Sequence, residues 1–176
     1  MKMLDPEVKR LINEQIQKEF YSAYLYLDFA NYFKSKGLDG YANWYSIQVQ
    51  EEVAHAQIFM NYMHDNDCFI ELLTIDKPKS NLDSIDSVLK QGYEHEQFVT
   101  ASINTIYDAA YSQRDFRTMQ FLDWFIKEQG EEEANASDMI TKYELFGKDA
   151  RALYSLDNEY KARTYTIPSP LASTNV

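Results

Sequence analysis

Four long segments of the chain place apolar residues at alternating spacings of three and four, the pattern of one buried face of an α-helix. Each apolar stripe is interrupted near its middle by glutamate, or by glutamine and glutamate, and the second also carries a histidine. The stripes are Ile12, Ile16, Glu19, Ala23, Tyr26, Ala30 and Phe33; Tyr41, Tyr45, Gln48, Glu52, His55, Phe59 and Tyr62; Ile85, Leu89, Gly92, Glu96, Val99, Ile103 and Ile106; and Leu122, Phe125, Gln129, Glu132, Ala136, Met139 and Tyr143. Strand-like alternation is nearly absent, so the pattern predicts an all-α protein whose helices share one core.

The expected helix limits follow from capping residues and helix breakers. Asp5, Pro6 and Glu7 provide an N-cap, a proline at the first helical position and an acid in the first turn. Gly37 and Gly147 end two of the segments. Long helices are expected at about residues 5–35, 40–66, 83–112 and 115–146, with a shorter amphipathic helix at about 149–163. The tail, residues 164–176, contains two prolines and is expected to be extended or disordered.

The lengths of the connections predict how the helices pair. The first and third links are short, so each joins two helices into an antiparallel hairpin. About sixteen residues join the second helix to the third, and fully extended they reach roughly 50 Å at ~3.3 Å per residue. A helix of about 27 residues is only roughly 40 Å long, so this link can cross the whole bundle. The prediction is a four-helix bundle with one long crossover and a short fifth C-terminal helix, forming one domain over residues 1–163.

Composition and charge limit the classes of function. With 17 Lys and Arg against 28 Asp and Glu, the net charge of −11 disfavours nucleic acid as a partner. The one cysteine, Cys68, allows no intrachain disulfide or thiolate cluster. No stretch approaches the ~18 apolar residues of a membrane span, and Met1–Arg10 contains no signal-peptide core. The expected location is therefore the cytoplasm, without a membrane partner.

The polar interruptions of the stripes lie at matching depths. Both hairpins have the same spacing, because 33 residues separate Glu19 from Glu52 and also Glu96 from Gln129. Antiparallel helices meet at equal depth near their midpoints, where these residues lie. Burying these glutamates together with Glu132 is very costly unless the carboxyls are protonated or cations balance them. The layer is therefore expected to hold two divalent cations.

Glu52 and His55 indicate which cations these are. Their i, i+3 spacing on one helix directs both side chains at one point. Carboxylate oxygens combined with an imidazole nitrogen and open coordination positions suit iron or manganese. A single mid-helix glutamate is usually solvated, but four at one depth on apolar stripes favour a metal centre.

Several motifs resemble those of a known family. They are Asn13-Glu14-Gln15 leading to Glu19-Phe20-Tyr21-Ser22, Gln50-Glu51-Glu52 with His55, Tyr93-Glu94-His95-Glu96-Gln97, and Glu128-Gln129-Gly130-Glu131-Glu132-Glu133. Together they resemble the bacterial non-haem ferritins over about residues 5–163. The arrangement is also similar to the known ferritin-like di-iron template of buried glutamates with Glu-x-x-His pairs.

This resemblance implies a ferroxidase centre with two iron sites. The first would use Glu19, Glu52 and His55, with Gln129 close by. The second would use Glu52, Glu96 and Glu132, so that Glu52 bridges the two irons.

The resemblance also implies a third iron site next to the main centre. Its ligands would be Glu51, Glu128, Glu131 and Glu132. The spacing fits, because the three acids of the fourth helix share one face and Glu51 lies one step off the core stripe.

Two departures separate the chain from haem-containing relatives. The fourth helix has Gln129-x-x-Glu132 where bacterioferritins have a second Glu-x-x-His. The residue after the bridging glutamate is Val53, whereas bacterioferritins place a haem-ligating methionine there. No haem is therefore expected.

Other residues near the layer keep two interpretations. Tyr26, one heptad after Glu19, is either a core residue with a satisfied hydroxyl or an electron donor or hydrogen-bond partner beside the irons. Trp124 has the same alternatives. His64 and His95 are expected to be structural or solvated.

The expected function is iron storage with ferroxidase activity. Fe(II) would be oxidised by O2 or peroxide and stored as a ferric oxyhydroxide mineral, and the resemblance implies a cage of 24 identical subunits. One alternative is a non-storage di-iron or di-manganese oxidase with the same bundle. Another is a structural or interaction bundle with an empty polar layer.

Overall fold

The computed structural model describes residues 4–172, and every regular element in this range is a helix. The helices are α1 (Pro6–Ser35), α2 (Asp39–Asp65), α3 (Ile85–Ser112), α4 (Phe116–Phe146), α5 (Ala150–Lys161) and α6 (Ser169–Ala172). The all-α class and the five expected helices are confirmed, with limits that differ from the expected ones by a few residues.

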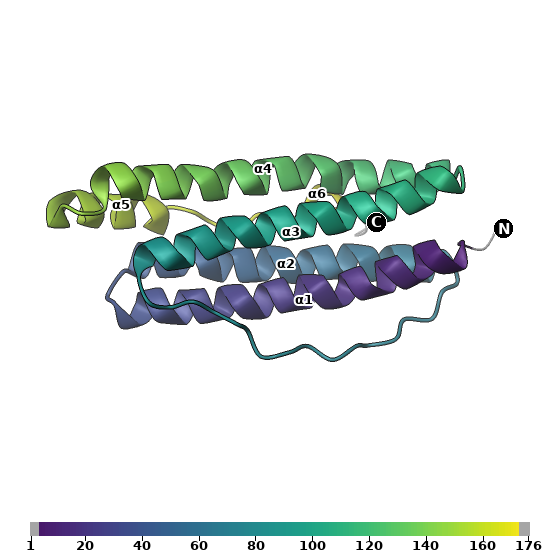
Figure 1. Ribbon diagram of the computed structural model, residues 1–176, viewed down its shortest axis with the longest axis horizontal. Coiled ribbons are helices and arrows are strands. Elements are labelled where there is room, and N and C mark those ends of the chain that lie inside the picture. Colours follow the sequence, from purple (N-terminus) through teal and green to yellow (C-terminus); the bar gives the residue numbers. More distant parts are fainter. Residues whose placement is uncertain (1–3, 173–176) are drawn as a thin grey trace.

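The helices form two antiparallel hairpins, α1 with α2 and α3 with α4, packed into one elongated bundle (Figure 1). The segment between α2 and α3, residues 66–84, runs beside α1 from one end of the bundle to the other. Asn13 of α1 holds this segment: its amide donates to the Glu71 carbonyl and its Oδ1 accepts from the Glu71 N–H, both at 2.9 Å. α3 therefore runs parallel to α2, which confirms the long crossover.

The buried apolar side chains form two clusters, one toward each end of the bundle. Along α1, the first cluster ends at Ile16 and the second begins at Leu25, and Glu19 lies between them. α2 runs in the opposite direction, with Tyr45 in the second cluster, Ile58 in the first and polar residues between them. The polar layer is therefore closed at both ends by packed apolar side chains.

The N-terminus of α2 is capped by a residue of another helix. Its own N-cap residue, Leu38, makes no side-chain cap, so the first N–H groups of the helix need another acceptor. Asp157 of α5 supplies one, because the N–H groups of Gly40 and Tyr41 donate to its Oδ1 at 2.7 and 3.1 Å. A carboxylate at this position also interacts favourably with the helix dipole. The contact fixes α5 against the start of α2.

The C-terminal tail differs from the expectation of an extended or disordered segment. Ser169–Ala172 form one helical turn, α6, which lies against α2. Leu171 is half-buried against the first apolar cluster. Residues 173–176 of the expected tail lie outside the described residues. Among residues 4–172, no helix is both long and apolar enough to cross a bilayer.

We predict that Gly40→Ala destabilises the protein. A Cβ at Gly40 would lie 1.6 Å from the Asp157 carbonyl oxygen, so α5 must move, at a cost of about 1–3 kcal/mol. Thermal unfolding followed by circular dichroism should show a lower midpoint. The matched control is Gly130→Ala on α4, whose Cβ would meet no atom within 4 Å and which should gain up to ~1 kcal/mol of helix propensity. Equal midpoints for the two variants would contradict the close approach of α5.

Candidate metal centre

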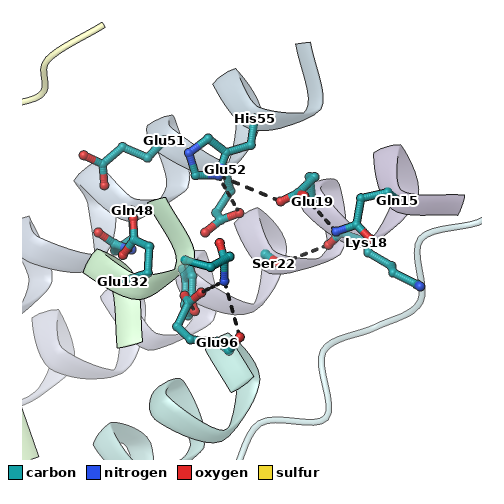
Figure 2. Close-up of polar contacts among 12 residues, drawn as sticks. Gln15, Lys18, Glu19, Ser22, Gln48, Glu51, Glu52, His55, Glu96 and Glu132 are labelled. Atoms are coloured by element: carbon teal, nitrogen blue, oxygen red, sulfur yellow. Dashed lines mark hydrogen bonds and ion pairs between the residues drawn. The ribbon is translucent and has the colours of Figure 1, made fainter. Parts of the chain in front are cut away.

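Glu19 of α1 and Glu52 and His55 of α2 converge in the polar layer (Figure 2). One potential ligand atom from each residue lies within 4.8 Å of the other two. All three side chains are 2 % exposed or less. The structure thus brings together the three residues expected to form the first iron site.

The geometry of this cluster suits a cation. His55 Nδ1 lies 3.5 Å from Glu52 Oε2 and 3.9 Å from Glu19 Oε2. Neither of these two carboxylate oxygens accepts a hydrogen bond from any described residue. Buried carboxylate oxygens without donors are costly, and a divalent cation between them and the imidazole nitrogen would satisfy all three atoms.

Glu96 and Glu132 approach the same layer from α3 and α4 and are held by neutral donors. The Tyr26 hydroxyl donates to Glu96 Oε1, and Gln129 Nε2 donates to Glu96 Oε2 at 3.1 Å. Gln48 Nε2 donates to Glu132 Oε2 at 2.9 Å. Both carboxylates are thereby oriented inside the layer, as a second metal site requires.

Two of these contacts refine the sequence-based expectations. Tyr26 is a hydrogen-bond partner of Glu96, and its additional role as an electron donor remains a prediction. Gln129, expected close to the first site, donates its amide to Glu96, and its role as an iron ligand remains a prediction.

Burial and mutual repulsion raise the pKa values of the carboxyls. Burial is the main cause of the raised pKa of Glu19 and of Glu52, and the charges of neighbouring glutamates add to it. Burial, followed by the Glu96 charge, raises the pKa of Glu132 to about 8. The Glu96 pKa is also raised by burial, although the hydrogen bonds from Tyr26 and Gln129 oppose the shift. Without a cation, part of the layer is therefore protonated at neutral pH.

The residues of the expected third iron site lie on the edge of the centre. Glu51 Oε2 accepts from Arg163 Nη2 at 2.7 Å, and its carboxylate points away from Glu52 in Figure 2. The Glu131 side chain is 61 % exposed and lies 3.4 Å from Lys127 Nζ. Glu128 is half-buried, and burial raises its pKa. The third site remains a prediction.

His95 and Trp124 lie beside the layer, and His64 lies away from it. The Ser22 hydroxyl lies 2.7 Å from His95 Nε2, and burial lowers the pKa of His95 to about 4, so this imidazole is neutral and structural. Trp124 packs edge-on against the His55 ring with centroids 5.6 Å apart. His64 is exposed near the end of α2.

Two glutamines that orient ligands were missed as site residues by the sequence analysis. Gln48 contacts Glu132, and Gln15 Nε2 donates to Glu19 Oε1 at 2.8 Å. The sequence indicates that both glutamines lie near the site, because Gln48 lies on the core stripe and Gln15 lies four residues before Glu19 on the same helix face.

Carboxylates and a histidine gathered at the middle of a four-helix bundle with one crossover are typical of metal-binding carboxylate bundles. A model of the ferritin-like domain matches residues 9–146. The bacterial non-haem ferritin of Campylobacter jejuni is 38 % identical over 159 residues, covering 90 % of this chain and 95 % of the relative. An engineered closed form of Archaeoglobus fulgidus ferritin aligns with a TM-score of 0.90 at 40 % identity, covering 93 % of this chain and 99 % of the other. The chain belongs to the ferritin-like family.

We predict that metal binding releases protons near neutral pH. A cation must displace the proton from Glu132, whose pKa is about 8, so affinity for Zn(II) should rise with pH up to that value. Calorimetry at pH 7 in buffers of different ionisation enthalpy counts the released protons. Glu132→Gln should release fewer of them, whereas Glu144→Gln, an exposed position on α4, should leave the count unchanged. A count of zero in the natural protein would show that the layer is already ionised.

Proposed function

We propose that the protein stores iron and oxidises Fe(II) at a two-iron ferroxidase centre. The observation that supports this most strongly is the buried group of Glu19, Glu52 and His55, whose unpartnered oxygens face one imidazole nitrogen. Fe(II) is the substrate, and O2 or peroxide accepts the electrons. The ferric product is stored as an oxyhydroxide mineral.

Different side chains would bind each of the two Fe(II) ions. Glu19 and His55 would hold the first, Glu96 and Glu132 the second, and Glu52 would bridge them. Two irons in one layer can deliver two electrons together to one oxidant. Apolar clusters at both ends keep water away from the layer, which strengthens each ion–carboxylate interaction.

Hydrogen bonds from neutral groups keep the second pair of carboxylates in place during this cycle. Tyr26 and Gln129 fix the two oxygens of Glu96, and Gln48 fixes Glu132. Neutral donors orient the carboxylates without adding positive charge, so the layer retains its attraction for cations.

We further propose that the subunits assemble into a cage of 24 copies in the cytoplasm. Large apolar side chains remain exposed on the outer face of α1 and α2 and on the crossover, among them Leu27, Val53, Leu72 and Ile75, which are 42–76 % exposed. Exposed apolar surface of this kind favours a protein interface. A second copy of the chain is the partner expected for a homo-oligomer with closed symmetry.

Iron loading tests this function. After aerobic addition of Fe(II), electron microscopy should show electron-dense mineral cores inside particles of about 500 kDa, the mass of 24 copies of a 20.7 kDa chain. A monomer or dimer that oxidises Fe(II) without forming cores would instead support a non-storage oxidase. A protein that binds no metal would support a structural bundle.

Glu52→Ala should abolish rapid Fe(II) oxidation and core formation while the helices remain folded. The change removes the bridging ligand from both sites, and losing one buried charge relieves repulsion in the metal-free layer. Stopped-flow absorbance measures the initial rate, and circular dichroism checks the fold. Glu144→Ala on the exposed face of α4 is the matched control and should oxidise Fe(II) at the natural rate. A natural initial rate in Glu52→Ala would refute the assignment.

The third iron site adds a separate prediction. Replacing Glu51, Glu128 and Glu131 together by alanine should leave two Fe(II) bound at the main centre but change the rate after the first turnover. Arg163→Gln should raise iron occupancy beside Glu51, because it removes the competing guanidinium.

Anomalous diffraction from iron-soaked crystals measures that occupancy, with Lys142→Gln on α4 as a control that removes a cation elsewhere. The absence of an iron peak among the three glutamates, together with unchanged multi-turnover kinetics in the triple variant, would leave them as an acidic surface.

A further inference from the structure

A chain of three hydrogen bonds leads from a lysine near the surface to Glu19 in the metal centre. Lys18 Nζ donates to the Ser102 hydroxyl of α3 at 2.5 Å, and Ser102 donates to Gln15 Oε1 at 2.7 Å. Gln15 Nε2 then donates to Glu19 Oε1 at 2.8 Å. The two ends of the chain are neighbours in sequence but point in different directions around α1, and the hydrogen bonds connect them through Ser102 of α3 and Gln15 of α1.

The charges at the two ends of this chain favour one direction for its hydrogen bonds. A lysine ammonium has donors and no acceptor, so the Ser102 oxygen must accept from Lys18. The single hydroxyl hydrogen of Ser102 is then directed at the Gln15 oxygen. This fixes the Gln15 amide with its NH2 group toward Glu19, whereas a flipped amide would place its oxygen against the carboxylate.

The fixed amide determines which oxygen of Glu19 faces the cluster. Oε1 is engaged by Gln15, and Oε2 is left 3.9 Å from His55 Nδ1 without another partner. Figure 2 shows Glu19 between Gln15 on one side and Glu52 with His55 on the other. Gln15 is fully buried and Ser102 is 7 % exposed, so water does not readily replace either one.

Lys18 itself is held in place by a second contact. Its ammonium lies 5.8 Å from the centre of the Phe98 ring, a cation–π distance. Lys18 is half-buried between α1 and α3. The first donor of the chain is therefore more ordered than a free surface lysine.

We propose that Lys18, Ser102 and Gln15 are positioning residues that set the orientation of Glu19 and thereby the affinity and geometry of the first metal site. The proposal rests on the proposed function, because it takes Glu19, Glu52 and His55 as ligands of Fe(II). Partners that orient a ligand in this way commonly change metal affinity by 10–100-fold when they are removed.

Anaerobic titration with Co(II), whose visible absorption reports coordination geometry, tests the proposal. Ser102→Ala should lower affinity at the first site by roughly 10-fold and alter its spectrum, and Lys18→Met should shift both in the same direction. Ser102→Thr and Lys18→Arg keep the required donors and should restore most of the affinity. Lys36→Met is the matched control, because Lys36 lies over the ring of Tyr32, away from the centre.

The outcomes separate this proposal from the function on which it rests. His55→Ala should abolish the first-site signal, and if it binds Co(II) like the natural protein, the metal site itself is wrong. If His55→Ala loses the signal but Ser102→Ala and Lys18→Met retain natural affinity and spectrum, only the positioning role is overturned. A purely structural role would lower the unfolding midpoint of these variants without changing the Co(II) spectrum.

Discussion

The repulsion among glutamates buried in one layer is the constraint on which the rest of this structure depends. Glu19, Glu52, Glu96 and Glu132 are each 6 % exposed or less, and four ionised carboxylates could not coexist there without compensation. The protein compensates in two ways. Neutral donors engage some of the oxygens, and the remaining oxygens of Glu19 and Glu52 face the His55 imidazole. The hydrogen bonds from neutral donors orient the carboxylates. The unpartnered oxygens leave negative charge in the layer that a cation can balance.

The length of the helices allows the bundle to offset the free-energy cost of burying these carboxylates. Helices of 27 to 31 residues extend beyond the layer on both sides, and each side contains its own apolar cluster. Burial of those side chains provides the stabilisation that offsets the polar layer. The crossover between α2 and α3 is equally necessary, because it sets the direction of the second hairpin and so brings its glutamates to the depth of those in the first.

Features set by helical periodicity and register were predictable from the sequence. The apolar stripes predicted which face of each helix is buried. The equal spacing of Glu19–Glu52 and Glu96–Gln129 predicted that these residues lie at the same depth in both hairpins. These two facts place Glu19, Glu52 and His55 in one layer, and the family resemblance implied that they form one site. Periodicity does not determine the exact rotation of one hairpin against the other, so it did not predict that the Gln129 amide donates to Glu96.

Contacts between distant elements were not predictable in this way. The capping of α2 by Asp157, the ion pair of Glu51 with Arg163 and the link from Lys18 to Ser102 each join polar residues of different helices or of a helix and the residues after α5. Polar residues off the core stripe have no periodic signal, and a solvated position is their usual interpretation. Their partners become visible only when the packing of α5 and α3 is known.

The two edges of the centre are consequently supported in different ways. Glu19 is held by a buried amide whose orientation depends on residues inside the α1–α3 contact. Glu51 is held by Arg163, whose guanidinium stacks 4.0 Å from the centre of the Trp44 ring and remains 18 % exposed. A cation that displaces Arg163 supplies its own positive charge to Glu51, whereas reorienting Glu19 breaks hydrogen bonds inside the α1–α3 contact. A fixed carboxylate beside an edge with an exchangeable partner is consistent with the proposed function, in which iron is bound, oxidised and then passed on.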